Sequence, residues 1–514
     1  GIAFVAARGG YSVLVVEPDA EARRRGTERI AHDAERAGDP SIADRISWSD
    51  ALPQDSEASI AIEAVPERFD LKRDTFVALA RALAPDALLA TNTSSLSVAD
   101  LADAVDRPQR VIGLHFFNPP AAMKLIEVVH APETSDDAIE RAYAFVGRAG
   151  KTAVLAADTP GFIVNRVARP FYLQSMRALA KDVASAEELD ALARSAGFRM
   201  GPFELMDLIG LDINLATTES VYDRTEAKRL APVDIQQTMV AQGRLGRKTG
   251  AGFYDYSGDV PKLDLSVEKP SGEPNDDEVV ALLGLGGVVE ELAELLQQRY
   301  ASVQRLENED MLDQLAADTT IVIDAGDGTT DRHGILTTLD SMLGPETIFF
   351  ADAYATDVAA CAARMRHPER LVGYGVLGSL AAQRAVEIVD SDSASDDALE
   401  LAQELFASIG KGVMLVEDVP ALFLGRVVGS IVNEAVIAVH DEIATPDDVD
   451  TAMRLGTNYP IGPVEWGREI GGARLTRILQ RLADAEGSEF APHRSLWILD
   501  VEEEAQSEPV ETST

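Results

Sequence analysis

RVIGLHFFNPPAAMKLIEVV, at residues 110–129, contains the pattern that decides the fold of this 514-residue chain. An apolar run ends there in a polar loop marked by prolines, as a buried strand does at the edge of a sheet. Three similar runs precede it: SVLVVEP at 12–18, ASIAIEAVPE at 58–67 and ALLATNTSS at 87–95. We expect SVLVVEP to be a buried strand like the others. Because amphipathic helical patterns separate the four runs, the sequence predicts a doubly wound parallel α/β sheet.

The pattern becomes helical after this region. FIVNRVARPFYLQSMRALA begins at residue 162, and SAEELDALARSA follows at 185 with Ser185 and Glu188 placed as a capping box. Residues 257–276 are rich in Gly, Pro, Ser and charge without a period, which is typical of a linker.

The second half of the chain repeats the first at an offset of about 260 residues. RPQRVIGLHFFNPPAAMKLIEVV at 107 is answered by HPERLVGYGVLGSLAAQRAVEIV at 367, and DTPGFIVNRV at 158 by DVPALFLGRV at 418. We therefore predict a duplicated two-domain unit. Its parts are an α/β domain at 1–156, an all-α domain at 157–256, the linker at 257–276, a degenerate second α/β domain at 277–416, a second all-α domain at 417–486 and an acidic tail at 487–514.

Composition excludes several classes of protein. The formal net charge of -40 opposes binding to a nucleic-acid backbone. No apolar run approaches the roughly 20 residues that span a bilayer, and no signal peptide is recognised, so we expect a cytoplasmic protein without a membrane partner. Cys361 is the single cysteine, which excludes internal disulfides and cysteine metal clusters. We expect no metal site.

The net negative charge of the chain has two interpretations. Dispersed Asp and Glu pairs favour an ordinary solvated surface. A salt-rich cytoplasm, in which counterions screen the repulsion, is the alternative, and stabilisation by KCl would distinguish it.

Four polar residues lie where strands end or a helix starts: Ser94, His115, Glu127 and Asn165. The motifs around them are TNTSSL, GLHFFNPPAAMKLIEVV, DTPGFIVNR and MGPFELMDLIGLD. In order and spacing these motifs resemble the 3-hydroxyacyl-CoA dehydrogenase family over residues 1–256, with a weaker second match over 277–485. The tandem arrangement is similar to members that act on hydroxybutyryl-CoA or hydroxyadipyl-CoA.

The resemblance implies a Rossmann-like fold and an enzyme that oxidises (S)-3-hydroxyacyl-CoA with NAD. Oxidation of a secondary alcohol needs a base for the hydroxyl proton, a task that suits His115. Glu127 would orient the imidazole and stabilise its charged form. The resemblance implies that Ser94 and Asn165 hydrogen-bond the substrate oxygen. Alone, a histidine after a strand is more often structural, and the four surrounding motifs favour catalysis.

Cofactor contacts follow from the fold and the resemblance. An acid at the end of the second strand, Glu17, would bind the adenosine ribose and favour NAD over NADP, although such an acid is as often simply exposed. The resemblance places further residues at the nicotinamide end of NAD: Glu67, Lys72, Asn92, Ser94, Asn118 and Lys248. Arg23, Arg24 and Arg25 are weaker candidates for binding CoA phosphates, since such a triplet is usually solvated surface.

Two departures from the family pattern are visible. The G-x-G-x-x-G fingerprint is absent ahead of GIA at residue 1, so we expect a chain truncated before its first strand and phosphate loop. The second copy has Tyr354, Gly375, Gly378 and Gly425 where the first has Ser94, His115, Asn118 and Asn165, and keeps only Glu387 for Glu127. LLGLGGVVEE at 282–291 retains a G-x-G without its third glycine.

These departures predict one catalytic site and a structural or regulatory second copy. The two helical domains would pair as a pseudo-dimer within the chain, or two chains would form a homodimer. Two other functions stay open: a catalytically impaired CoA- or nucleotide-binding homologue, and a dehydrogenase of a small polyol or sugar acid.

Overall fold

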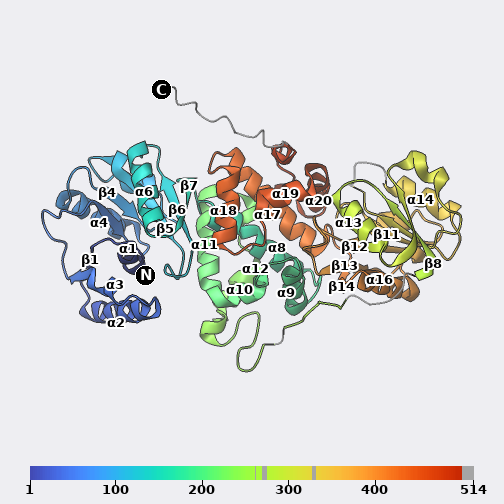
Figure 1. Cartoon of the computed structure of the whole chain (residues 1–514), viewed down its shortest axis with the longest axis horizontal. Helices are drawn as coiled ribbons and strands as arrows, with labels where there is room; N and C mark the ends of the chain where they lie inside the picture. Colours follow the sequence, from blue (N-terminus) through green and yellow to red (C-terminus); the bar gives the residue numbers. More distant parts are fainter. Residues whose placement is uncertain (261, 269–274, 327–331, 501–514) are drawn as a thin grey trace, which may run out of the picture. The chain divides into compact units, whose positions relative to one another are not determined.

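The computed structural model describes residues 1–260, 262–268, 275–326 and 332–500. Figure 1 shows the helices and strands of the chain, and internal contacts divide them into two compact units. Unit 1 contains residues 1–168, 216–226 and 438–462, and unit 2 contains 169–215, 227–437 and the chain from 463 onward. Each unit therefore includes segments from both halves of the sequence, where the first half is residues 1–256 and the second half starts after the linker.

Unit 1 contains a five-stranded sheet in the order β3-β4-β5-β6-β7 and a separate parallel pair, β1-β2. The strands are β1 (Val13–Val16), β2 (Ile46–Ser49), β3 (Ile60–Glu63), β4 (Leu88–Thr91), β5 (Val111–Phe116), β6 (Leu125–His130) and β7 (Thr152–Ala157). The predicted Rossmann-like fold is confirmed, with one correction to the predicted parallel sheet. Strand β6 runs antiparallel to β5, because the short connection at 117–124 turns the chain straight back.

The helices of unit 1 lie around the five-stranded sheet and the β1-β2 pair (Figure 1). They are α1 (Ile2–Arg8), α2 (Ala20–Arg36), α3 (Ser41–Asp44), α4 (Phe69–Ala82), α5 (Val98–Ala102), η1 (Pro108–Arg110), α6 (Asp136–Arg148), α7 (Val164–Val167) and, from the second half, α18 (Pro446–Gly456). The core packs α6 residues Phe145 and Val146 on strand residues such as Ile112 and Val128. Burial of these apolar side chains is the main source of stability here.

The strand predicted at 12–18 forms as β1, but the prediction that it is buried is wrong. Leu14 is 43% exposed and Val16 is 38% exposed. The physical reason is that β1 pairs only with β2, so alternate side chains point away from the helices that cover the other face.

Unit 2 contains a seven-stranded sheet in the order β14-β13-β12-β11-β10-β8-β9. The strands are β8 (Asn275–Leu283), β9 (Tyr300–Leu306), β10 (Ile321–Asp324), β11 (Ile348–Asp352), β12 (Leu371–Gly375), β13 (Ala385–Asp390) and β14 (Gly412–Glu417). Strand β8 joins β9 to β10 in this sheet. In the first half, where every residue up to 260 is described, no strand joins β1 to β3. The expected truncation remains a prediction.

The helices of unit 2 come from both halves. From the first half they are α8 (Arg169–Ala180), α9 (Ala186–Ser195), α10 (Pro202–Ile209), α11 (Leu211–Thr225, which continues into unit 1), η2 (Lys228–Leu230), α12 (Asp234–Ala241) and η3 (Arg247–Thr249). From the second half they are α13 (Gly287–Leu296), η4 (Glu309–Gln314), α14 (Arg332–Met342), α15 (Val358–Ala362), η5 (Pro368–Arg370), α16 (Asp396–Ser408), α17 (Leu422–His440), α19 (Pro463–Ile470), α20 (Gly472–Glu486), η6 (Ser488–Phe490) and η7 (Leu496–Leu499). The predicted capping box of Ser185 and Glu188 is present at α9.

Helix α17 is long and apolar enough to cross a membrane by length and composition, but 89% of its apolar stretch is buried within the structure. Core helices of globular proteins pass the same test.

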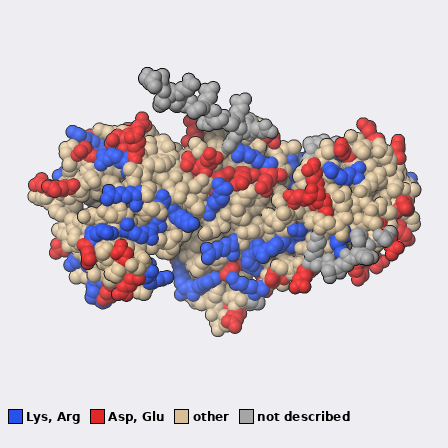
Figure 2. All heavy atoms as spheres, viewed as in Figure 1, with Lys and Arg blue, Asp and Glu red and all other residues tan. Residues whose placement is uncertain are grey.

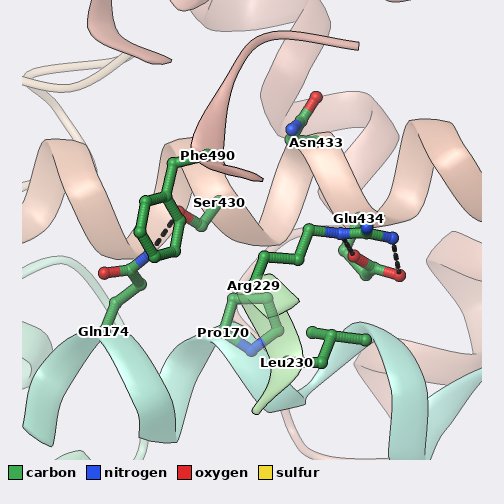
Figure 3. Close-up of a pocket in the computed structure, with 8 residues that line it drawn as sticks. All are labelled: Pro170, Gln174, Arg229, Leu230, Ser430, Asn433, Glu434 and Phe490. Atoms are coloured by element: carbon green, nitrogen blue, oxygen red, sulfur yellow. Dashed lines mark hydrogen bonds and ion pairs between the residues drawn. The ribbon is translucent and has the colours of Figure 1, made fainter. Parts of the chain in front are cut away.

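Helices of the two halves meet directly within unit 2. The Gln174 side chain donates to Ser430 Oγ at 3.1 Å, and Arg229 Nε contacts Glu434 Oε2 at 2.7 Å. Figure 3 shows both contacts around a small cavity, which Phe490 also lines. First-half and second-half helices are thus joined by partly buried polar contacts as well as by packing.

The sequence repeat is also a repeat of backbone contacts. In unit 1, Ala157 N–H donates to Ile443 O at 2.8 Å. In unit 2, the matching residues of the opposite halves meet, because Glu417 N–H donates to Val183 O at 3.3 Å. Each half therefore contributes to the other half's unit in the reciprocal manner of a two-fold interface.

Two predicted boundaries need correction. The first part of the acidic tail expected from residue 487 is instead ordered structure, because Phe490, Leu496 and Leu499 are buried and hold η6 and η7 beside α19 and α20. Residues 501–514 lie outside the described residues. The linker is also shorter than predicted, since β8 begins at Asn275, and residues 261 and 269–274 of that linker are not described.

The acidic side chains are spread over many elements on the face drawn in Figure 2, with Lys and Arg side chains among them. This arrangement is that of a mixed, solvated surface on this face.

Candidate active site

Polar side chains gather where three strands of unit 1 end. Strands β3, β4 and β5 are parallel, so Glu63, Thr91 and Phe116 end them at the same edge of the sheet. Ligands of open α/β sheets bind beyond this carboxyl edge. The segments that follow contain Glu67, Asn92, Ser94 and Asn118.

His115 and Glu127 form a buried pair at this edge. They face one another in the antiparallel register of β5 and β6. His115 Nδ1 lies 2.6 Å from Glu127 Oε2, and the two residues are 6% and 0% exposed. The sheet register therefore brings together two residues that the sequence predicted to act as a pair.

The second oxygen of Glu127 fixes the direction of this hydrogen bond. Glu127 Oε1 accepts the backbone N–H groups of Ile163 at 3.1 Å and Val164 at 2.9 Å, where α7 begins. A carboxylate that receives these donors acts as an acceptor toward His115 as well, so the imidazole hydrogen lies on Nδ1. This tautomer leaves the lone pair of Nε2 free to accept a proton.

Aromatic rings border the imidazole. The ring centroids of Phe117 and Phe162 lie 4.6 Å and 5.7 Å from that of His115. Because apolar rings displace water, the imidazole of His115 lies in surroundings of lowered polarity.

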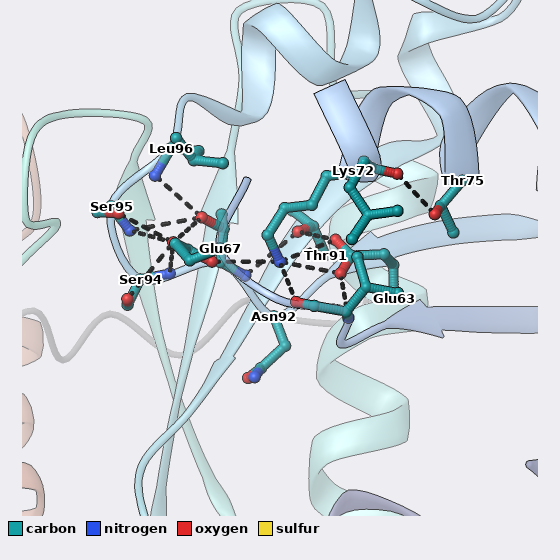
Figure 4. Close-up of polar contacts among 12 residues, drawn as sticks. Glu63, Glu67, Lys72, Thr75, Thr91, Asn92, Ser94, Ser95 and Leu96 are labelled. Carbon is teal, nitrogen blue, oxygen red and sulfur yellow. Dashed lines mark hydrogen bonds and ion pairs between the residues drawn. The ribbon is translucent and has the colours of Figure 1, made fainter. Parts of the chain in front are cut away.

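Glu67 holds the loop that contains Ser94, as Figure 4 shows. Its Oε1 accepts from Thr93 Oγ1 at 2.6 Å and from the backbone N–H groups of Ser94 and Ser95 at 2.9 Å and 3.0 Å. Burial acts to raise the pKa of Glu67, but the hydrogen bond from Thr93, the charge of Lys72 and the loop donors together lower it to about 2. The carboxylate is thus a fixed anion that anchors this loop.

The other side of the same loop is held by a helix. Arg224 Nη1, on the part of α11 that belongs to unit 1, donates to Ser95 O at 2.6 Å. Ser94 itself is half-buried at the tip of the loop.

Lys72 is buried, with its side chain directed toward Glu63 and Glu67 (Figure 4). Its Nζ contacts Glu63 Oε1 at 2.9 Å, Glu67 Oε2 at 3.2 Å and Val65 O at 3.2 Å. Sequence reasoning assigned Lys72 to the cofactor and missed Glu63. Its position directly at the end of a strand, nine residues before Lys72, was the available signal. Lys72 is 1% exposed and occupied by these partners, so the structure places it as a bridge between two carboxylates.

The three asparagines differ in their surroundings. Asn165 lies half-buried on α7, next to the backbone amides that bind Glu127. Asn92 Oδ1 accepts Phe116 N–H at 2.9 Å and so ties the end of β4 to the end of β5. Asn118 is exposed just beyond β5.

The remaining predicted residues lie elsewhere. Glu17 follows β1, and its Oε1 accepts Asp19 N–H at 3.0 Å. Arg23 donates to the backbone carbonyls of Glu17 and Pro18, while Arg24 forms ion pairs with Glu21 and Glu28 on its own helix. Lys248 belongs to unit 2, where it forms an ion pair with Asp212.

The donor set of unit 1 fits two parts of a dinucleotide. A carboxylate at the end of β1, Glu17, suits ribose hydroxyls. The half-buried Ser94 and exposed Asn118, at the carboxyl edge of the sheet, suit an amide-bearing ring.

The corresponding place in the second half is filled by one side chain. A Cβ at Gly375 would lie 2.6 Å from the ring of Tyr354, and a Cβ at Gly425 would lie 2.8 Å from it. Tyr354 Oη donates to Glu387 Oε2 at 2.5 Å. Phe423 and Leu424 donate their N–H groups to Glu387, as Ile163 and Val164 do to Glu127. The tyrosine therefore occupies the space that His115 and Asn165 need in the first half.

The second half is also closed by an ion pair within unit 2. Arg474, on α20, contacts Asp352 Oδ2 at 2.9 Å and donates to Val376 O at 2.6 Å. Both charged residues are almost fully buried. The α/β and helical parts of the second half are thereby tied together next to Tyr354.

Comparison with known proteins finds the same two domains in each half of the chain. The family model for the 3-hydroxyacyl-CoA dehydrogenase NAD binding domain matches residues 1–159 and again 281–419. The model for the C-terminal domain of the same family matches residues 161–256 and 423–506.

Two of the proteins compared match nearly the whole chain, and a third matches half of it. The 3-hydroxyadipyl-CoA dehydrogenase of Escherichia coli (strain K12) is 34% identical over 505 residues, covering 95% of this chain and 92% of that protein. The crystal structure of 3-hydroxybutyryl-CoA dehydrogenase from Escherichia coli K12 superposes with a TM-score of 0.78 at 32% identity, covering 96% of this chain and 94% of the other. The probable 3-hydroxybutyryl-CoA dehydrogenase of Bacillus subtilis (strain 168) is 37% identical over 266 residues, which is 50% of this chain and 93% of that protein.

Proposed function

Because this chain belongs to the 3-hydroxyacyl-CoA dehydrogenase family, we propose that it oxidises (S)-3-hydroxyacyl-CoA to 3-oxoacyl-CoA with NAD as the hydride acceptor. The observation that carries this proposal is the buried contact of 2.6 Å between His115 Nδ1 and Glu127 Oε2. It supplies an oriented base at the carboxyl edge of a sheet of the NAD-binding type.

His115 acts as the base in this reaction. The lone pair on Nε2 takes the proton of the substrate hydroxyl while the C3–H bond breaks and the C3 carbonyl forms. Glu127 stabilises the imidazolium because its carboxylate is 2.6 Å away and is itself held by two backbone amides. In the reverse direction the same imidazolium returns the proton to the oxygen.

Ser94 and Asn165 orient the substrate oxygen toward His115. Glu67 and Arg224 hold the loop of Ser94 from two sides, and α7 holds Asn165. Hydrogen-bonding side chains on elements that are fixed in this way restrict the reacting groups to productive geometry.

When bound, NAD supplies the hydride acceptor. Glu17 would hold its adenosine ribose, and Asn92, Ser94 and Asn118 would lie at its nicotinamide end. Glu67 and Lys72 contribute indirectly. Glu67 holds the Ser94 loop, and Lys72 holds Glu67 in place through ion pairs with Glu63 and Glu67. Lys248 is a further candidate of the same proposal.

The direct test is NADH oxidation in the presence of acetoacetyl-CoA. We expect turnover that depends on both compounds, and loss of turnover with retained NADH binding in His115→Gln. His367→Gln, at an exposed histidine of the second half, is the matched control for the same substitution away from His115. Absence of turnover with retained NADH binding would support the impaired homologue, and turnover of a polyol or sugar acid alone would support the other alternative.

We further infer that the helical parts of the two halves pair within one chain, in a cytoplasmic enzyme whose partner is an acyl-CoA. The reciprocal contacts Ala157–Ile443 and Glu417–Val183 support pairing, as does Arg229–Glu434. A mass of about one chain, 55.1 kDa, in solution is the expected result of light scattering, and an obligate two-chain particle would contradict it.

A further inference from the structure

A second-half segment lies directly behind the catalytic pair in unit 1. Helix α18 packs on β6, β7 and α7. Strand β6 contains Glu127, and α7 contains Asn165 and begins with Val164, one of the two amide donors to Glu127. An element of the base-free half therefore contacts both elements that orient the catalytic carboxylate.

Gly456 brings this helix close. It is the last residue of α18, and a Cβ there would lie 3.0 Å from Leu125 Cδ2 and 3.0 Å from Val164 Cγ2. Leu125 begins β6, two residues before Glu127. A Cβ at 456 would press on the side chains of Leu125, on the strand of Glu127, and of Val164, whose backbone N–H binds Glu127.

An ion pair makes a second connection. Arg166 Nη2, on α7, lies 3.1 Å from Asp441 Oδ2. The Arg166 side chain is 8% exposed, so loss of the Asp441 carboxylate would remove a counter-charge from a nearly buried guanidinium. Arg166 directly follows Asn165, and movement of this arginine would move the turn of helix that holds both Asn165 and the Glu127 amides.

The matching positions of the repeat do not form this ion pair in the second half. Arg426 of the second half matches Arg166, but the residue that matches Asp441 is Lys181, a cation. Arg426 and Lys181 both form ion pairs with Glu486 instead. The backbone contacts of the two-fold arrangement are duplicated, whereas the Arg166–Asp441 pair occurs only behind the half that has His115.

We propose that the second half of the chain positions the catalytic residues of the first half. Asp441 acts through Arg166, and Gly456 acts through Leu125 and Val164, to hold β6 and α7 so that Glu127 stays oriented on His115. Both are positioning residues, and neither touches substrate. This inference rests on the proposed function for its kinetic test, but the geometry of the pair can be followed separately.

The test compares Asp441→Asn and Gly456→Ala with Glu442→Gln, which removes an exposed carboxylate from the neighbouring position. Three readouts apply: kcat and KM for acetoacetyl-CoA, the low-field proton resonance of His115 Nδ1–H, and thermal unfolding. The resonance is assigned by its loss in His115→Gln.

We expect kcat to fall by about 10-fold to 100-fold in Asp441→Asn with a much smaller change in KM, because small misplacements at a reacting centre have effects of this size. The His115 resonance should shift in both Asp441→Asn and Gly456→Ala. The conservative variant Asp441→Glu, which keeps a carboxylate at this position, should retain much of the parent kcat. Glu442→Gln should leave all three readouts unchanged. A lowered unfolding temperature with unchanged kcat and an unchanged resonance would overturn the proposal. A shifted resonance in a chain that turns over no acyl-CoA would support the positioning role and reject the proposed function.

Discussion

Tyr354 Oη donates a hydrogen bond of 2.5 Å to Glu387 Oε2, at the place in the second half where His115 meets Glu127 in the first. Both carboxylates are fully buried, and each accepts two backbone amides from the helix that follows. The carboxylate site is thus present in both halves. The group that it orients differs, because one half has an imidazole at this place and the other has a phenol that fills the space.

Packing around Tyr354 predicts sensitivity at two glycines. Gly375→Ala and Gly425→Ala should each lower the free energy of unfolding by about 1–3 kcal/mol, because the added methyl would overlap the tyrosine ring. Chemical unfolding measures this. Gly147→Ala is the matched control. This glycine lies within α6 with open space around its Cβ position, so alanine there should stabilise by about 0.5–1 kcal/mol. Equal effects at all three positions would contradict the filled site.

The stability of the second half should depend on the charge of Glu387. Burial raises the pKa of Glu387 from 4.5 to about 7. Because the folded-state pKa lies above the unfolded value, folding favours the protonated form of Glu387. Its contribution to the free energy of unfolding is complete below pH 4.5 and is lost as the pH rises through about 7. The loss is roughly 3 kcal/mol by the free energy per pKa unit. Glu387→Gln should remove this part of the pH dependence between pH 5 and 8, as measured by urea unfolding at several pH values.

The control for this pH dependence is Glu294→Gln, an exposed position on α13. The free energy of unfolding of that variant should equal that of the parent chain at every pH. A Glu387→Gln curve parallel to the parent would show that Glu387 does not titrate in this window.

The two halves offer equivalent glutamates with opposite consequences for catalysis. Glu127→Gln should lower kcat by about 10³-fold to 10⁴-fold, because an amide neither fixes the His115 tautomer nor stabilises the imidazolium. Glu387→Gln should leave kcat close to the parent value, since Tyr354 replaces the base there. Steady-state NADH oxidation measures both. A comparable loss of kcat in both variants would mean that both halves contribute chemistry.

Lys72 should contribute mainly to stability. Its ammonium lies between Glu63 and Glu67, and Lys72→Met would leave Glu63 buried without its counter-charge. We expect a loss of roughly 3–5 kcal/mol in unfolding free energy. Adding Glu63→Gln should recover part of it, because the double variant no longer buries an unpaired charge. Arg73→Met, on the exposed face of the same helix, should change stability by less than about 0.5 kcal/mol. Weakened NADH binding without a stability change in Lys72→Met would instead assign Lys72 to the cofactor.

Much of the candidate site was readable from the sequence because its residues lie at strand ends and helix starts, which local patterns mark. Ser94, His115, Glu127 and Asn165 each follow a recognisable motif, and the duplication was visible from the repeat alone. Glu63 was missed, because an acid at the end of a strand has no distinguishing pattern until Lys72 is seen folded against it. The burial expected for SVLVVEP was wrong for a similar reason: burial of a strand depends on which neighbours it has, and β1 has only β2.

The amino-acid sequence by itself determined the class of fold, the repeat and the pairing of an imidazole with a carboxylate in one half only. These properties depend on short segments whose periodicity and residue types are local. The tertiary structure decided that Tyr354 fills the second site, that Lys72 bridges two glutamates, and that α18 and Asp441 support the strand and helix around Glu127. The first two relationships join residues within one half, and the third joins residues of opposite halves, such as Arg166 and Asp441, which are 275 positions apart. In each case the residues meet only because separate helices, strands and loops pack together.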